Sequence, residues 1–408
     1  MWEFLVVIIS FMSIPFLSKK NVPIGVALCI CAALMGLLGG LNFLAIKDVL
    51  SSTFLDIAKV QRYLIIVEIG ILGALLKKYN LIDDVIKYTV KVIKNKRIIL
   101  ACIPALIGLL SVPGGAIMSV PFVDKLGGES GLSPNHKAII NLVYRHIVMP
   151  VLPYDTSFLV LTSLVPQISL YKLIGLNGIF IVLYGALGYY LYLRPIDNDT
   201  FPNNPNTEPI LPNLLKLLLY TAPVYLAVIL NVLFNIPFYI GMIANFVMLY
   251  ILRPTKTFLL DMVQSFNVKI LLALVGVYLI QGVIEKFDSI SALFSLIFNS
   301  PQTILLGIAF ISLFFGLTTG FQPTALGIVL PILVTLPITN NRLLLYSHFT
   351  YVLSFMGYYF SPLHLCQLFT CEYLEIPAVG IYKDYWKFFL GLAVIAIANY
   401  FLLSLWLK

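Results

Sequence analysis

Charged residues are scarce in this sequence, and their scarcity excludes a water-soluble globule. Only 11% of the 408 residues are charged, whereas 60% are hydrophobic. An average soluble domain is about a quarter charged and roughly half apolar. Too little polar surface is present to cover a soluble protein of this size. The composition therefore predicts a polytopic, all-α membrane protein.

Motifs for catalysis and for metal binding are also missing. The sequence contains no HExxH, P-loop or G-x-S-x-G motif, and no cysteine–histidine metal cluster is apparent. Its five cysteines lie in apolar runs without a CxxC pair, which is typical of small buried hydrophobic residues. The net charge of +8 is explained by lysines on the cytoplasmic side of a membrane protein. We therefore expect that the protein is not an enzyme and has no nucleic-acid partner. We expect no cofactor other than a coupling ion, either sodium or a proton.

Long apolar runs are present instead, and they occur in two similar series. A polar segment rich in proline and asparagine at 194–213 separates them. This pattern indicates an internal duplication, with repeats at 1–193 and 214–408 joined by a linker. The runs are 2–17, 22–44, 62–79, 98–122, 138–165 and 172–193, followed by 214–236, 237–252, 268–285, 301–336, 343–371 and 385–407.

The fourth run of each half is interrupted by turn-forming residues. The interruptions fall at 111–116 in the segment 97–127 and at 317–323 in the segment 301–336. Proline and glycine free backbone groups that hydrocarbon cannot satisfy, so each segment is either a kinked helix that crosses once or a re-entrant hairpin. An arm of about 14 residues reaches about 21 Å, past the middle of a ~30 Å core without crossing it.

The distribution of lysine and arginine favours the hairpins. Hairpins place most basic residues, including the cluster at 77–97, on the cytoplasmic side, whereas single crossings divide them almost evenly. Each half then crosses the membrane five times, so two halves of the same pattern have opposite orientations. The sequence therefore predicts two inverted repeats, a cytoplasmic linker at 194–213 and both termini outside.

The fifth run of each half is a broken helix. The first, at about 134–165, is interrupted by Pro150 and Pro153, and the second, at about 341–372, by Pro362. In transporters, discontinuous helices at the membrane midplane expose carbonyl groups and half-helix N-termini that coordinate ions and anionic substrates. The breaks therefore predict a solute or ion site near the middle of the membrane.

Asp155 and His364 occupy matched positions at these two breaks. A charge at the bilayer centre is costly, so an intramembrane ionisable residue predicts a functional site. The alternatives are a structural pair between Asp155 and Arg145, and a neutral His364 hydrogen-bonded to a freed carbonyl. Arg145 and His146 are candidate charge partners, either at the cytoplasmic entrance or near an anion. The full set of candidate substrate and ion ligands is Ser111, Pro113, Gly114, Gly115, Asp155, Thr156, Ser157, Thr318, Thr319, Gly320, Gln322, Ser361 and His364, although the glycines could serve the turns alone.

This arrangement resembles the ion-transporter superfamily, which includes sodium-coupled dicarboxylate symporters, citrate and gluconate transporters and sodium/proton antiporters. The resemblance covers nearly the whole chain and includes a short amphipathic helix on either side of the third span. The motifs S-V-P-G-G-A at 111–116 and S-P-L-H-L-C at 361–366 are similar to those of an uncharacterised prokaryotic branch. The resemblance implies a homodimer in the prokaryotic cell membrane and an elevator movement of hairpins and broken helices against a scaffold. The Ser-Asn-Thr signatures of the dicarboxylate symporters are missing, so it does not name the substrate.

The sequence therefore predicts a secondary transporter of a small solute, coupled to sodium or protons. The positive ends of hairpin arms and half-helices favour an organic anion as that solute. One alternative is a cation/proton antiporter in which Asp155 and His364 titrate. The other is a non-transporting membrane scaffold or lipid-handling protein. The expected partners are the solute, the lipid bilayer and a second copy of the chain.

Overall fold

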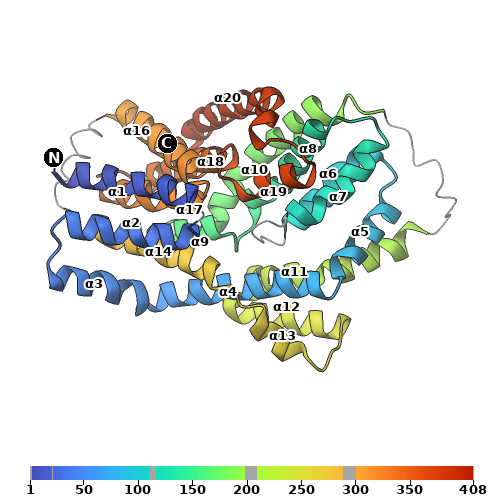
Figure 1. The fold of residues 1–408 in the computed structure, drawn as a ribbon, viewed down its shortest axis with the longest axis horizontal. Helices are drawn as coiled ribbons and strands as arrows, with labels where there is room; N and C mark the ends of the chain where they lie inside the picture. The colour runs from blue at the N-terminus through green and yellow to red at the C-terminus, as the bar shows by residue number, and fades with distance from the viewer. Residues whose placement is uncertain (1, 21, 110–115, 198–208, 288–299, 408) are drawn as a thin grey trace.

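The computed structural model of the protein describes residues 2–20, 22–109, 116–197, 209–287 and 300–407. Helices account for 82% of the structure, and no strand occurs in these ranges. The prediction of an all-α fold is therefore confirmed. Figure 1 shows the helices gathered into one elongated body.

The helices of the first half follow the predicted runs, with short helices between the longer ones. Several begin at a residue that caps the first turn, such as Asp56 before the fourth helix. The elements are α1 (Trp2–Lys19), α2 (Ile24–Leu38), α3 (Phe43–Phe54), α4 (Ile57–Lys78), α5 (Leu81–Val92), α6 (Lys96–Gly108), α7 (Ala116–Gly128), α8 (Pro134–His146), the 3-10 turn η1 (Met149–Val151), α9 (Thr156–Leu164), α10 (Leu170–Gly188) and the π-helical η2 (Tyr189–Leu193).

The second half has a comparable series of helices. One of the short amphipathic helices expected beside the third span of this half, at 287–298, lies almost entirely outside the described residues. The elements are α11 (Ile210–Phe234), α12 (Phe238–Leu252), α13 (Phe258–Gln264), α14 (Val268–Ile284), α16 (Pro301–Thr319), α17 (Gln322–Thr335), α18 (Asn340–Tyr359), α19 (Leu365–Tyr373), the 3-10 turn η3 (Ala378–Ile381) and α20 (Tyr382–Trp406).

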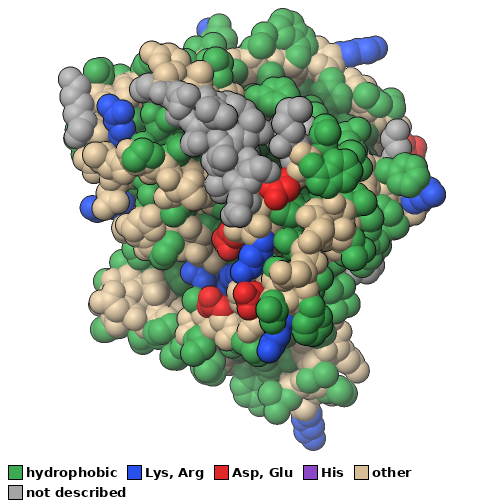
Figure 2. All heavy atoms as spheres, turned by 90° about the vertical axis from the view of Figure 1, so that its left-hand side faces the viewer, with side chains coloured by type: hydrophobic (Ala, Val, Ile, Leu, Met, Phe, Trp, Pro, Cys, Tyr) green, Lys and Arg blue, Asp and Glu red, His purple; other side chains and the backbone are tan. Residues whose placement is uncertain are grey.

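Among the described residues, five helical segments are long and apolar enough to cross a membrane, which supports the prediction of a membrane protein. Figure 2 shows a face covered largely by hydrophobic side chains, with charged side chains gathered near its middle. The five segments are Pro134–Leu164, Leu170–Leu193, Ile210–Phe234, Gln302–Thr319 and Ala378–Trp406, and shorter apolar helices include Gly25–Leu38, Phe238–Leu252, Leu271–Ile284 and Gln322–Thr335.

Two pairs of helices correspond to the segments predicted as hairpins. In the first helix pair, α6 and α7 pack against each other and both contact α8. In the second helix pair, α16 and α17 pack against each other and both contact α18. Figure 1 shows α6 and α7 side by side in teal. Each helix pair therefore lies on the first helix of the broken segment from its own half.

Helices from the two halves also pack crosswise. α2 lies against α14, and α12 lies against α4. The second arms of the helix pairs reach further across, because α17 packs on α9 and α7 packs on α19. The halves therefore share one core, and the two broken segments lie inside it.

Glycines allow some of these helices to approach at backbone distance. A Cβ atom added to Gly357 of α18 would lie 2.6 Å from the carbonyl oxygen of Leu313 on α16, and one added to Gly316 would lie 2.7 Å from the amide nitrogen of Tyr358. Real Cβ atoms do not approach so closely, so only glycine fits at either position. Small residues at such contacts are typical of helix packing in membranes, where close van der Waals contact drives association.

Candidate functional site

The two broken segments bring non-helical backbone into the protein interior. In the first, α8 ends at His146, η1 begins with Met149 and Pro150, and α9 starts only at Thr156. In the second, α18 ends at Tyr359 and α19 starts at Leu365. Proline lacks an amide hydrogen and clashes with the preceding turn, which explains why neither helix continues. The freed backbone groups must therefore find partners in protein or in a polar cavity.

Asp155 is buried and caps the second half of its broken segment. Its side chain is 4% exposed, and its carboxylate accepts a hydrogen bond of 2.9 Å from the amide of Ser157. Asp is a preferred residue at a helix N-terminus, because its carboxylate accepts a hydrogen bond from an unpaired amide and its negative charge is stabilised by the positive end of the helix dipole. No ion pair joins Asp155 to Arg145 among the described residues, so capping accounts for this carboxylate better than the proposed structural pair does.

A buried hydrogen-bond network joins the first break to the second helix pair. The hydroxyl of Ser157 donates to Gln322 Oε1 at 2.9 Å. The Gln322 amide donates to the carbonyl of Tyr351 at 3.0 Å and to the hydroxyl of Ser354 at 3.3 Å. Gln322 is the first residue of α17 and is 1% exposed. The network therefore fixes the position of α17 relative to α9 and α18.

The turn of the second helix pair touches the second break. Gly320 links α16 to α17 with a φ of 62°, a left-handed conformation that glycine adopts without strain. A Cβ atom there would lie 2.9 Å from backbone atoms of Leu363, so the two turns are in direct contact. Ser361 reinforces this contact, since its hydroxyl donates to the carbonyl of Leu317 at 2.5 Å.

The second break also meets the end of α8, where two histidines and a cysteine come together. The ring centroids of His146 and His364 are 4.7 Å apart. One nitrogen of each ring and the sulfur of Cys366 all lie within 4.8 Å of one another, and all three residues are buried. The sequence motifs did not indicate this group. His146 comes from the first half of the chain and His364 and Cys366 from the second, so only the H-x-C spacing of 364–366 is visible in the sequence.

The remaining candidate residues that the structure describes lie at helix ends and in helical turns near these contacts. Thr319 is buried and donates to the carbonyl of Phe315 at 2.6 Å, whereas Thr318 is partly exposed and donates to that of Phe314 at 2.8 Å. Thr156 is the first residue of α9, and Arg145 is buried in the last turn of α8. Candidates Ser111, Pro113, Gly114 and Gly115 of the first hairpin tip lie outside the described residues.

Asp155 and His364 make different hydrogen bonds and ring contacts, although Tyr358 both interacts electrostatically with Asp155 and lies against the ring of His364. Asp155 contacts Ser157 and, through it, Gln322, whereas His364 contacts His146, Tyr358 and Tyr359. No hydrogen bond between Asp155 and His364 occurs in the described part of the chain. That the candidates together form a solute or ion site near the middle of the membrane stays a prediction.

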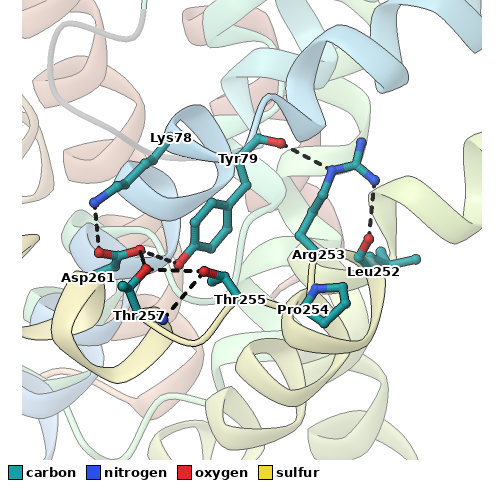
Figure 3. A pocket seen from close by; sticks show the side chains of 8 residues that line it. All are labelled: Lys78, Tyr79, Leu252, Arg253, Pro254, Thr255, Thr257 and Asp261. Atoms are coloured by element: carbon teal, nitrogen blue, oxygen red, sulfur yellow. Dashed lines mark hydrogen bonds and ion pairs between the residues drawn. The ribbon is translucent and has the colours of Figure 1, made fainter.

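A separate cavity of about 370 Å³ lies at the surface, where the end of α4 meets the segment between α12 and α13 (Figure 3). The ammonium of Lys78 and the hydroxyl of Tyr79 both donate to the Asp261 carboxylate at 2.8 Å. Arg253 donates to the carbonyl of Tyr79 at 3.2 Å and pairs with Asp84. This polar cluster attaches the short helix α13 to the end of α4.

We expect this attachment to depend on pH. The pKa of the Asp261 carboxyl lies below its usual value, mainly because Lys78 donates a hydrogen bond to it and secondly because Tyr79 does. A carboxyl whose pKa is lowered on folding stabilises the fold above the unfolded-state pKa of about 3.9, and that contribution is lost as the pH falls through the folded-state pKa. Asp261→Asn should therefore speed hydrogen exchange in 258–264 at pH 7, whereas the wild-type segment should loosen only below about pH 4.

Asp83→Asn provides the control for this prediction, because Asp83 is exposed on α5. Exchange rates, corrected for the intrinsic effect of pH, should not change in that variant. If Asp261→Asn left exchange in α13 unchanged, the attachment would not depend on this carboxylate.

Comparison with known proteins gives a family but no activity. A comparison with curated proteins found no match. The sequence profile of the family described as "Protein of unknown function (DUF401)" matches residues 3–405. Because this match covers nearly the whole chain, the protein belongs to the DUF401 family.

Proposed function

We propose that the protein is a secondary active transporter of a small solute, with an organic anion as the preferred class, coupled to sodium or protons. The observation that carries this proposal is that the helix pair of each half packs on the broken segment of the other half. α17 lies on α9, and α7 lies on α19. Buried side chains bridge both contacts. Ser157 bonds to Gln322, and Asn141 of α8 donates to Thr370 of α19 at 3.0 Å and to the Ala116 carbonyl of α7 at 3.3 Å. Interrupted helices at the junction of two halves are where transporters bind solutes and ions.

The order of the helices supports an origin by duplication. Each half begins with two long helices, a short helix and another long helix, which are α1 to α4 in the first half and α11 to α14 in the second. Each half then ends with a helix pair, a broken segment and a last long helix. The contacts match as well, since α2 on α14 corresponds to α12 on α4. In the proposed architecture the halves 1–193 and 214–408 are inverted repeats, and the helix pairs and broken segments move together against the other helices. The homodimer implied by the resemblance stays a prediction.

Asp155 is the proposed coupling residue. It is a buried carboxylate at the end of a half-helix, beside backbone that the break has released. Such a group can bind sodium or carry a proton, and its role as a cap orients it. The antiporter alternative needs Asp155 and His364 to titrate as a pair, and the different contacts of these residues favour it less.

Flux into proteoliposomes tests the proposed function and separates the alternatives. A symporter should accumulate one member of a panel of labelled mono-, di- and tricarboxylates when a sodium or proton gradient is imposed. A cation/proton antiporter should instead change the internal pH on addition of sodium, with no organic solute present. A membrane scaffold should do neither, and that result would refute transport.

The hairpin topology makes a matched prediction for two surface positions. Gly128 has open space around its Cβ position at the end of α7, and Gln167 is exposed between α9 and α10. Hairpins place Gly128 inside and Gln167 outside. In a chain without native cysteines, an impermeant thiol reagent added to intact cells should label Gln167→Cys but not Gly128→Cys. The reverse pattern would show that residues 97–127 cross the membrane once.

A further inference from the structure

The group formed by His146, His364 and Cys366 has the composition of a metal site. Two imidazoles and one thiol are donors that suit zinc and copper(I), whereas magnesium and calcium prefer oxygen. The three residues are 1%, 1% and 6% exposed, and they come from the end of α8, the residue before α19 and the first turn of α19. We propose that they bind a thiophilic cation such as Zn²⁺.

The hydrogen bonds of the two rings leave the same nitrogen available on each. His146 Nδ1 lies 2.7 Å from the carbonyl of Leu142, and His364 Nδ1 lies 3.2 Å from that of Tyr359. A carbonyl only accepts, so each Nδ1 carries the hydrogen and each Nε2 presents a lone pair. Metal-bound histidines are commonly oriented by such a bond from the other ring nitrogen.

The His364 Nε2 atom is the second observation that points to a ligand. It is buried and has no hydrogen-bond partner within the described residues. A buried polar atom without a partner costs about 1–3 kcal/mol, so this nitrogen calls for an explanation. A cation between His146, His364 and Cys366 would satisfy it.

The geometry fits a site with three protein ligands. The donor atoms lie within 4.8 Å of one another, whereas bonds of about 2.0–2.3 Å place tetrahedral zinc ligands about 3.3–3.8 Å apart. Side-chain rotation on binding would have to bring the donor atoms closer by up to about 1.0–1.5 Å. Three protein ligands leave the fourth position for water or a solute, as in zinc sites that exchange ligands.

The surroundings assign a particular role to Cys366. Aromatic rings enclose the group, with the Tyr358 ring 4.4 Å from that of His364 and the Tyr359 ring 5.1 Å from that of His146. Arg145 precedes His146 and interacts electrostatically with Cys366. The thiolate, not the thiol, is the metal ligand, so Cys366 would bring one negative charge to a bound cation.

Cobalt(II) is a suitable probe, since it takes the place of zinc and reports its ligands by absorption. The full-length protein, purified in detergent and stripped of metal, should bind one equivalent of Co²⁺. A thiolate-to-cobalt charge-transfer band should appear, together with the d–d bands of a tetrahedral ion, and Zn²⁺ should displace both. The absorption spectrum of the wild-type protein by itself tests whether a cysteine is a ligand. This result is therefore informative even if a substituted protein fails to fold.

Variants with matched controls locate the site. Cys366→Ser should abolish the charge-transfer band, and His364→Ala should weaken Co²⁺ binding by more than the roughly 10–100-fold that loss of an outer-shell partner costs. Cys371→Ser and His348→Ala are the controls, because both residues are buried on α19 and α18 but lie outside the group. They should bind as the wild type does.

Two outcomes would overturn the proposal. One is the absence of stoichiometric Co²⁺ binding, which would make the three side chains a polar cluster of the core. The other is a charge-transfer band that persists in Cys366→Ser. The measurement involves no gradient and no solute, so the metal site and the transport function can fail independently.

Discussion

Asp155→Asn is expected to reduce gradient-driven solute uptake to the background of protein-free liposomes while leaving the fold intact. Asparagine caps helices about as well as aspartate, so the hydrogen bond to the Ser157 amide is retained. The substitution removes only the negative charge, which the proposed mechanism requires to bind sodium or a proton. Uptake should be measured with the carboxylate that wild-type liposomes accumulate, together with the thermal stability of the purified variant.

Asp155→Ala separates the charge from the cap. It removes both, so it should lose transport and in addition destabilise the protein by about 0.5–2 kcal/mol. A purely structural role predicts a different pair of results, in which Asp155→Asn transports normally and only Asp155→Ala is impaired. That pair would exclude Asp155 as the coupling residue.

Gly357→Val is expected to produce a large loss of stability, because the contact between α16 and α18 has no room for a side chain. The added Cβ would lie 2.6 Å from the Leu313 carbonyl oxygen and 3.1 Å from the Gly316 Cα. Both neighbours are backbone atoms, so the helices must separate. Overpacking usually costs about 1–3 kcal/mol, and we expect a reduction in the free energy of unfolding at or above the top of that range.

Gly175→Val is the matched control for this substitution. Gly175 lies in α10 with nothing within 4 Å of its Cβ position, so the two variants share the same change in helix propensity and differ in packing. Equilibrium denaturation of the purified variants gives the comparison. Equal stabilities would contradict the close contact between α16 and the broken segment.

Much of the fold could be predicted from local sequence, because long apolar runs and prolines act locally. The ends of the apolar stretches lie within six residues of the helix ends, and Pro150 and Pro153 lie where the chain leaves helical geometry between α8 and α9. The sequence predicts that Asp155 is an intramembrane carboxylate, and the structure shows that it is buried. Its capping role follows from the same local logic, because a helix starts directly after it.

Contacts between the two halves could not be predicted from the sequence. Nothing local marks Gln322 as the partner of Ser157, or Cys366 as a neighbour of His146, since these residues meet only when α17 and α19 pack across the core. Cys366 looked like any other cysteine in an apolar run. Tyr351 and Ser354 were missed for a similar reason, because their partner is the amide of Gln322.

Reversal of solute movement by the ion gradient tests coupled transport most directly. Proteoliposomes containing the purified protein and equal carboxylate concentrations on both sides should show net uptake when sodium or proton concentration is higher outside. They should show net efflux when that gradient is inverted, and no net movement without a gradient. Movement that ignores the ion gradient, or no movement under any gradient across the carboxylate panel, would contradict the proposal of an ion-coupled secondary transporter.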